Sequence, residues 1–252
     1  AEDGIRDLVR SRGLGDVYKR QAPQPGALFY NKDFRTIEYW DGNFWRQVDN
    51  TTRSGRGLLA AGYRGDTEAE TDMITYIQVS TLGNAQDFGS LGANGTGSRR
   101  AGCSNGTRGL AGGAAPGNDY IDYLTIASTG NSQDFGNLTV GRYHSSSCSS
   151  STRGVWMNGY VHPSGNVNTI DYVEIATTGN ALDFGNLTAA KGNSSAVASS
   201  TRAVQGGGNT PSYVTTMDYV QIATTGDAFD FGDLSTAHSE MGGISNGHGG
   251  LG

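Results

Sequence analysis

Residues 170–187 read IDYVEIATTGNALDFGNL, and this stretch decides the fold. Its first half is rich in β-branched and aromatic residues such as Ile170 and Tyr172, which is typical of a strand. Thr178-Gly179-Asn180 has turn composition, because glycine adopts positive φ without steric cost. A second apolar run extends from Leu182 to Leu187. The stretch therefore predicts two β-strands joined by a turn.

The same pattern occurs four times along the chain. The three other copies read ITYIQVSTLGNAQDFGSL, IDYLTIASTGNSQDFGNL and MDYVQIATTGDAFDFGDL. Their shared Asp-Phe-Gly recurs at spacings of 47, 49 and 47 residues, beginning at Asp87, Asp134, Asp183 and Asp230. An arginine that opens a short apolar strand precedes each copy, at Arg56, Arg108, Arg153 and Arg202. A period of this length with these strand signals predicts four short strands per unit.

We place these units within residues 51–252, at about 56–107, 108–152, 153–201 and 202–248, with a stub at 249–252. Ser245–Leu251 aligns with Ser104–Leu110, so a fifth unit begins there. Repeat units of this size bury their apolar faces only against neighbouring units. We therefore expect the array to be a piece of a longer protein, with its oligomeric state open.

Composition narrows the class of protein. Glycine accounts for 40 of 252 residues, hydrophobic residues for 35% and charged residues for 17%. The net charge of −6 argues against nucleic-acid binding through a basic surface. No apolar run is long enough to predict a membrane span. Two cysteines cannot form a disulfide framework.

The order of the repeat signals resembles the Kelch motif. An apolar strand ends in a glycine pair, as at Gly112-Gly113, and a tyrosine and then a second aromatic residue follow. The resemblance implies an all-β fold, a partial Kelch-like β-propeller of four-stranded blades, with four repeats and the start of a fifth. The expected structural positions are Arg108, Arg153, Arg202, Tyr123, Tyr172, Tyr219, Phe135, Phe184 and Phe231. Two features depart from the Kelch pattern: aspartate precedes the tyrosine, and the glycine pair is broken at Ala61-Gly62 and Asn158-Gly159.

Residues 22–50 precede the repeats and contain GALFYNKDFRTIEYWDGNFWRQV, which predicts a β-hairpin module with a turn at Asp41-Gly42-Asn43. This segment resembles a hairpin module in structural proteins of tailed bacteriophages, tail fibres included. The repeat is also similar to repeats in virion proteins of such phages. The resemblance implies a location in the virion, with other virion proteins or host-surface glycans as partners. Without it, the location is open and an extracellular one is an alternative.

Residues 1–21, AEDGIRDLVRSRGLGDVYKRQ, differ from the rest of the chain. They match a translated sequencing-library adapter: a standard adapter gives Ala1–Asp7, a sample index gives Leu8–Arg10, and a transposase adapter gives Ser11–Gln21. We therefore predict that this segment is an artefact and exclude it from fold reasoning.

The chain lacks the motifs of known enzyme sites. Asp-Phe-Gly also occurs in protein kinases, but here it recurs four times without a kinase catalytic loop, which favours a turn with a buried phenylalanine. We expect no catalytic, metal-binding or cofactor-binding residues. Cys103 and Cys148 each lie five residues before a repeat arginine, which indicates a core position. An ion pair with the repeat aspartate is the default role of the arginines.

Variable loops between the glycine pair and the next strand are the expected binding region, because loops on a rigid scaffold carry specificity. Aromatic and histidine side chains there could stack on sugars, namely Tyr120, Tyr160, His162 and Tyr213. Together with the resemblance, the sequence thus predicts a non-enzymatic structural or adhesion module, a virion- or tail-associated propeller of a phage that mediates assembly or surface binding, with the part of the particle left open. Two alternatives are a carbohydrate-binding, lectin-like propeller and a fragment of a propeller enzyme that acts on polysaccharide.

Overall fold

The computed structural model describes residues 24–31, 36–40, 42–43, 45–48, 55–79, 82–92 and 97–245. The adapter-like segment and the predicted stub lie outside these residues. All regular elements in these ranges are β-strands, which confirms the all-β prediction. In this part of the chain no helix has the length and apolar character needed to cross a membrane. The chain divides into two compact units, one ending at Gly55 and the other beginning at Arg56.

The first unit contains a three-stranded antiparallel sheet in the order β1-β2-β3. Its strands are β1 (Leu28–Asn31), β2 (Thr36–Trp40) and β3 (Trp45–Val48). Trp40 pairs with Trp45 across the β2–β3 connection, where Gly42 has a φ of 106°. That value favours glycine, in agreement with the turn predicted at this position.

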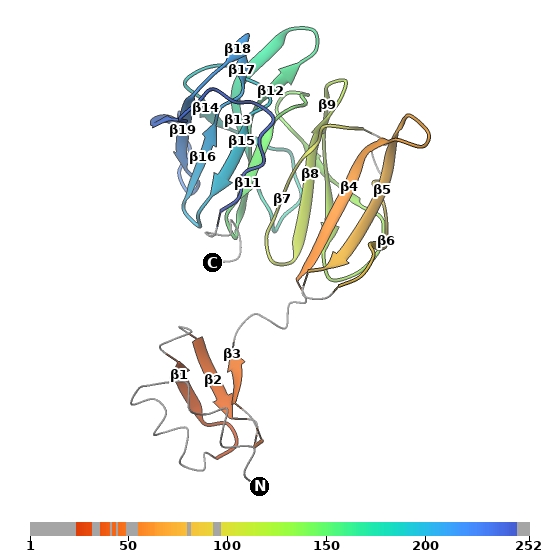
Figure 1. Cartoon of the computed structure of the whole chain (residues 1–252), viewed down its shortest axis with the longest axis vertical. Coiled ribbons are helices and arrows are strands. Elements are labelled where there is room, and N and C mark those ends of the chain that lie inside the picture. Colours follow the sequence, from red (N-terminus) through yellow and green to blue (C-terminus); the bar gives the residue numbers. More distant parts are fainter. Residues whose placement is uncertain are drawn as a thin grey trace. The chain divides into compact units, whose positions relative to one another are not determined.

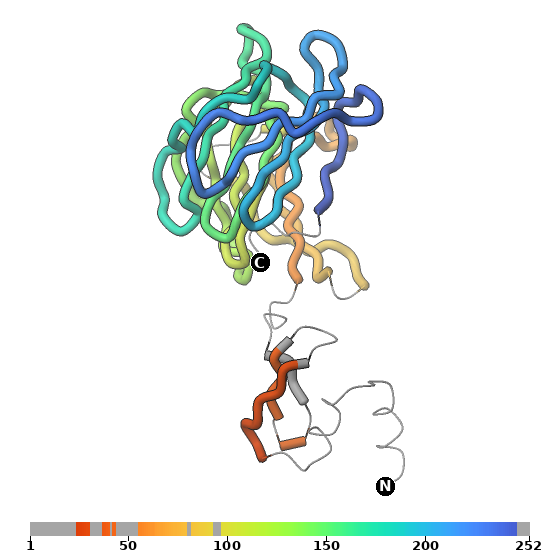
Figure 2. Tube along the Cα trace, turned by 90° about the vertical axis from the view of Figure 1, so that its left-hand side faces the viewer, coloured from red at the N-terminus to blue at the C-terminus, as the bar shows by residue number. Residues whose placement is uncertain are grey.

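The second unit contains four antiparallel sheets that follow one another in chain order (Figures 1 and 2). Sheet 1 consists of β4 (Arg56–Arg64), β5 (Ala69–Gln78) and β6 (Gln86–Ser90). Sheet 2 consists of β7 (Ala101–Ser104), β8 (Arg108–Ala114), β9 (Asn118–Thr125) and β10 (Gln133–Asn137). Sheet 3 consists of β11 (Ser146–Ser149), β12 (Arg153–Val161), β13 (Gly165–Glu174) and β14 (Leu182–Asn186).

Sheet 4 consists of β15 (Ser195–Ala198), β16 (Arg202–Gly206), β19 (Thr216–Gln221) and β20 (Phe229–Asp233). A small hairpin of β17 (Asn209–Thr210) and β18 (Ser212–Tyr213) lies between β16 and β19 in the chain.

Each four-stranded sheet begins one strand before the repeat arginine. In sheet 2, Ser104 at the end of β7 pairs with Gly109 of β8, and the amide of Asn105 donates to the Arg108 carbonyl at 3.0 Å. This tight turn joins β7 to the strand that follows it. The unit boundary placed at Arg108 from the sequence therefore falls inside a sheet, although the period is unchanged.

The chain after sheet 4 returns to the first strand of that sheet. The Ser245 hydroxyl donates to the Ala198 carbonyl at 2.8 Å. One unit earlier, the Ser149 hydroxyl donates to the Ser104 carbonyl at 2.7 Å. The contact supports the alignment of Ser245 with Ser104, because the same step between units recurs at both places.

Apolar layers fill the spaces between successive sheets, as repeat units require. Phe135 of sheet 2 packs with Trp156 of sheet 3, and Phe184 of sheet 3 packs with Val220 of sheet 4. Cys103 and Cys148 are free thiols in these two layers, in agreement with the predicted core position. Phe88 occupies the corresponding place between sheets 1 and 2.

The last repeat phenylalanine differs from the others in burial. Phe88, Phe135 and Phe184 are 2–3% exposed, whereas Phe231 is 47% exposed. The next sheet covers each of the first three, and no sheet among the described residues covers Phe231. On the other face of the first sheet, where no described sheet of this unit packs, Ile77 and Val79 are exposed. Both ends of the array therefore expose residues that inner units bury.

The repeated Asp-Phe-Gly docks the turn of the following sheet. The amide of Gly179, in the turn of sheet 3, donates to the Phe135 carbonyl of sheet 2 at 2.7 Å. Asn180 Oδ1 accepts from the amide of Asn137 at 3.1 Å. Gly136 has a φ of 144°, and a β-carbon there would overlap the Gly179 carbonyl. The motif is thus a contact between sheets, and its glycine allows the two backbones to approach.

This docking recurs at each junction between described sheets. Gly130 donates to the Phe88 carbonyl at 2.8 Å, and Gly226 donates to the Phe184 carbonyl at 2.7 Å. Asp227 takes the place of Asn180 at the last junction and accepts from the amide of Asn186 at 2.8 Å. Asparagine and aspartate can both fill this role, because each has an Oδ1 atom that accepts a hydrogen bond.

The arginine, tyrosine and phenylalanine of each repeat form one stack. In sheet 2, the Arg108 guanidinium lies 4.5 Å from the Tyr123 ring centroid, and Tyr123 meets Phe135 edge to face at 6.0 Å. Arg108 also donates to the Ile175 carbonyl of sheet 3 at 2.7 Å. The predicted pairing with the repeat aspartate does not occur here, because the guanidinium is held by an aromatic face and by the next sheet's backbone.

We call the segment from the last strand of one sheet to the first strand of the next a connector. A buried ion pair joins the connector to the sheet that follows it. The aspartate that precedes the repeat tyrosine is at most 1% exposed in sheets 2, 3 and 4. Its partner is a basic residue that lies just before the first strand of the same sheet. The pairs are Arg100–Asp122 at 2.7 Å, Arg142–Asp171 at 2.7 Å and Lys191–Asp218 at 3.0 Å. Aspartate before tyrosine, a departure from the Kelch pattern, is explained by this buried pair.

Candidate ligand-binding site

The connectors that enter successive sheets share one unusual backbone position. Two residues before the first strand of sheets 2, 3 and 4, and again at Glu240 after sheet 4, the backbone is left-handed, with φ between 55° and 62°. The residues at this position are Arg99, His144, Asn193 and Glu240. Left-handed conformations of residues other than glycine are uncommon, and such strain clusters at functional sites. The scaffold thus repeats, while the side chain at this position changes chemically from unit to unit.

Hydrogen bonds between connectors place three of these residues in a row, and Arg99 lies over the Tyr143 ring next to His144. The amide of Asn193 donates to the His144 carbonyl at 3.1 Å, and the amide of Glu240 donates to the Asn193 carbonyl at 2.8 Å. Three adjacent units therefore present a histidine, an amide and a carboxylate side by side. We call Arg99, His144, Asn193 and Glu240 the connector row.

A pair of tyrosines beside the connector row is specific to one unit. Tyr143 and Tyr160 exchange backbone hydrogen bonds of 3.1 and 2.7 Å, and their ring centroids lie 5.4 Å apart. In the next unit the same bridge joins Gly192 to Asn209. A β-carbon at Gly192 would lie 2.8 Å from Asn166 Oδ1, so the glycine allows the Asn166 side chain to approach at this position. A cavity lies next to the two tyrosines.

That cavity has a volume of 570 Å³. Side chains from three of the described units line it, including Arg99, Tyr143, His144, Tyr160, Asn166, Asn193 and Asn209. Its size falls in the range of small-molecule sites, and its walls combine aromatic faces with polar groups. The arrangement suits a polar ligand with flat apolar faces.

Two basic side chains, Arg99 and His144, line the cavity. The Arg99 guanidinium lies 5.7 Å from the Tyr143 ring centroid. Burial lowers the pKa of His144 from its ordinary value, and the charge of Arg99 lowers it further, whereas Glu240 and a hydrogen bond with Asn193 raise it. His144 is therefore neutral at pH 7. Arg99 supplies the positive charge at this end of the connector row.

The structure brings only one of the four predicted ligand-binding residues to this cavity. Tyr160 lines it, whereas the part-buried Tyr120 lies in β9. His162 is exposed on the turn between β12 and β13. Tyr213 is 65% exposed in β18, close in sequence to the lining residue Pro211 but outside the cavity.

Sequence reasoning missed the rest of the cavity wall. Arg99, Tyr143 and His144 lie in the connectors between sheets, and the prediction considered only the loops within sheets. An alignment of the connectors would have shown one position occupied by Arg, His, Asn and Glu. That variation was the available signal.

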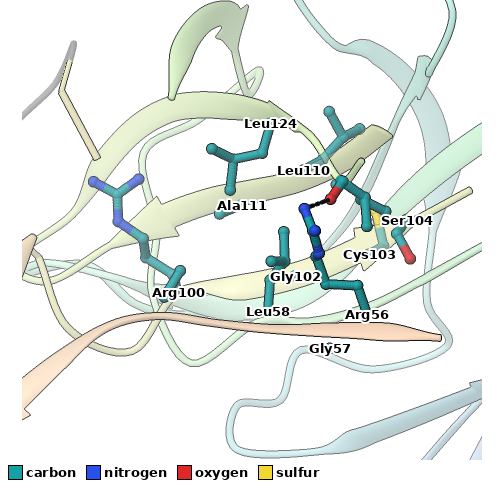
Figure 3. A pocket seen from close by; sticks show the side chains of 13 residues that line it. Arg56, Gly57, Leu58, Arg100, Gly102, Cys103, Ser104, Leu110, Ala111 and Leu124 are labelled. Atoms are coloured by element: carbon teal, nitrogen blue, oxygen red, sulfur yellow. Dashed lines mark hydrogen bonds between the residues drawn. The ribbon is translucent and has the colours of Figure 1, made fainter. Parts of the chain in front are cut away.

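A second cavity, of 350 Å³, lies between sheets 1 and 2 (Figure 3). Ala111 lines it, and the equivalent position one sheet later holds Trp156, which is fully buried and packs at Gly112. The cavity therefore results from a small residue in a packing layer. Arg56 at its wall stacks on Tyr76 and donates to the Ile126 carbonyl at 2.9 Å. Its guanidinium therefore already has partners within the protein.

Comparison with known proteins assigns the chain to no family. The chain matches no protein-family model, and no curated protein matches it in sequence.

Proposed function

We propose that this protein is a non-enzymatic binding module of a phage tail-associated protein, built as part of a Kelch-like propeller, and that it binds a surface ligand beside the connector row. The observation that carries the binding role is the connector row itself. One left-handed backbone position presents a different polar side chain in each of four connectors, next to a cavity with two tyrosines.

The arrangement of the sheets supports the propeller. In a propeller, four-stranded sheets surround an axis and their first strands face it. Here the first strands β7 and β11 contact each other, as do β11 and β15. The exposed Phe231 and Val79 at opposite ends of the array are positions that a neighbouring sheet buries elsewhere. Further units against these two faces would complete a ring.

Saccharides are the ligand class that fits the cavity best. Tyrosine rings offer flat faces to the apolar side of a sugar ring, and the amides of Asn166, Asn193 and Asn209 offer donors and acceptors to its hydroxyl groups. This proposal joins the phage assignment to the lectin-like alternative, since a tail module that contacts a host surface meets glycans there.

A saccharide array tests the binding role. The fluorescently labelled full chain is expected to bind a subset of saccharides, and a variant with Tyr143→Ala and Tyr160→Ala is expected to lose that binding. Tyr213→Ala is the matched control, because Tyr213 is exposed outside the cavity. Equal binding by the double variant, or no binding by the wild-type chain, would contradict the proposal.

The phage assignment rests on the sequence resemblance and has a separate test. Amplifying the gene and its flanks from the source material, with primers that exclude the adapter-like segment, gives the neighbouring genes. Terminase, portal or tail genes are expected beside it. Metabolic genes on both sides would refute the phage assignment and leave the binding role standing.

A further inference from the structure

Among the described residues, no carboxylate pairs with the cation at one end of the connector row. Arg99 is exposed, and within the described residues it forms no ion pair with a carboxylate. Arg100, its neighbour in sequence, is buried against Asp122 instead. Glu240, the only carboxylate of the connector row, lies beyond His144 and Asn193 in that row. The end of the cavity at Arg99 is therefore positive in a protein whose net charge is −6.

The chemistry of Arg99 selects the kind of ligand. A guanidinium presents parallel N–H donors that match a carboxylate or a sulfate, and it prefers such partners to neutral hydroxyl groups. The Tyr143 ring lies against this guanidinium, and Tyr160 lies against Tyr143. A ligand that extends from Arg99 along the two rings would present an anionic group at one end and flat ring faces beside it.

We infer that the cavity binds an acidic saccharide, whose carboxylate or sulfate pairs with Arg99 while its sugar rings lie against Tyr143 and Tyr160. This inference rests on the proposed binding function and names the ligand class for the same site. His144 is neutral at pH 7 and donates or accepts a hydrogen bond beside the anionic group. Asn166 and Asn193 line the part of the cavity that would contact the uncharged hydroxyl groups.

The test compares matched acidic and neutral saccharides on the full chain. The probes are oligosaccharides that alternate glucuronate with N-acetylglucosamine, sulfated heparin-derived oligosaccharides, and chitin oligosaccharides as the neutral counterpart, together with an array of other acidic and neutral sugars. Affinity is measured by titration calorimetry for each probe bound on the array. Acidic saccharides are expected to bind, with an affinity that falls as salt is added.

Arg99→Gln is expected to weaken that binding about 10- to 100-fold, as for the loss of charge-assisted hydrogen bonds. Arg64→Gln is the matched control, because Arg64 is an exposed arginine at the end of β4 that pairs with Asp66. Arg99→Asn is a second variant, since asparagine tolerates left-handed backbone and Asn193 occupies the equivalent position. Far-ultraviolet circular dichroism and thermal unfolding establish that each variant is folded.

Each outcome separates the inference from the proposed function. Binding of the acidic probes that depends on Arg99 and Tyr143 supports both. Binding of neutral sugars alone, lost in Tyr143→Ala and unchanged in Arg99→Gln, overturns the acidic ligand and keeps the binding role. Acidic binding that neither variant changes places the site elsewhere and overturns the inference. No binding to any saccharide overturns both.

Discussion

The amide of Gly179 donates a hydrogen bond of 2.7 Å to the carbonyl oxygen of Phe135, which lies in the preceding sheet. The bond joins the two most constant parts of the repeat, the turn glycine of one unit and Asp-Phe-Gly of the unit before it. Both residues are therefore repeated for one reason, the contact between sheets. An isolated unit cannot make this bond, so the repeat specifies an array as well as a sheet.

Gly136→Ala is expected to destabilise the protein by about 2 to 5 kcal/mol. Alanine at a φ of 144° is strained, and its β-carbon would overlap the Gly179 carbonyl. Gly179→Ala is the matched control, because a β-carbon at Gly179 meets no atom within 4 Å. Chemical denaturation followed by tryptophan fluorescence gives both free energies of unfolding. Equal stabilities of the two variants would refute the role assigned to Gly136.

Asp171→Ala is expected to cost about 3 to 5 kcal/mol of stability, because it leaves the Arg142 guanidinium buried without a counter-charge. Burial already lowers the pKa of Arg142, and Asp171 opposes that shift. Replacing both residues, as in Arg142→Met with Asp171→Leu, should recover much of the loss. Asp66→Ala removes the exposed pair with Arg64 and should leave the melting temperature unchanged. A double variant as unstable as Asp171→Ala would contradict this account.

The fold was predictable where the sequence repeats. Four copies of one pattern set the strand content and the period, and the apolar alternation of the strands set which faces meet between sheets. The start of each sheet was not predictable in the same way. Strand β7 is short and poor in large apolar residues, so its sequence does not show whether it pairs with the strand before or after it. The tight turn from Ser104 to Gly109 decides that question.

The candidate site was predictable only in part. Tyr160 was found because it lies in a variable loop with other aromatic residues. Tyr143 was missed because it lies in a connector between sheets, whereas the prediction considered only the loops within sheets. The ion pairs were missed too, since Arg142 and Asp171 are 29 residues apart and no local pattern joins them. Contacts between connectors and sheets arise from the stacking of units.

Neither cysteine is expected to react with a thiol reagent in the folded protein at pH 8. Burial raises the pKa of the Cys148 thiol to about 12, and burial with the nearby Cys148 raises that of Cys103. The reactive thiolate is therefore scarce in the folded state. A disulfide-exchange assay should count two thiols only after denaturation, without prior reduction. Rapid labelling of the native protein would contradict the buried position of Cys148 and the packing of the part-buried Cys103 between sheets.

The same thiols make stability depend on pH on the alkaline side. Their pKa is higher in the folded state than in the unfolded chain, so their contribution is complete below the unfolded pKa and is lost as the pH rises through the folded value. The free energy of unfolding is expected to fall above about pH 8.5, the ordinary pKa of cysteine. Cys148→Ala should show a smaller decline between pH 8 and pH 10 than the wild type. An unchanged decline in the Cys148→Ala variant would show that other titrating groups cause the loss of stability.

Affinity for an acidic saccharide is expected to rise as the pH falls below about 6.5, the ordinary pKa of histidine. Burial and Arg99 lower the pKa of His144, whereas Glu240 and Asn193 oppose that shift. A bound anion beside His144 also favours the imidazolium form, so proton uptake and ligand binding strengthen each other. His144→Asn, which suits the left-handed backbone, should remove the increase measured by calorimetry between pH 7.5 and pH 5. His162→Asn is the matched control, because His162 is exposed on a turn outside the cavity, and an identical pH response in both variants would exclude His144 as its source.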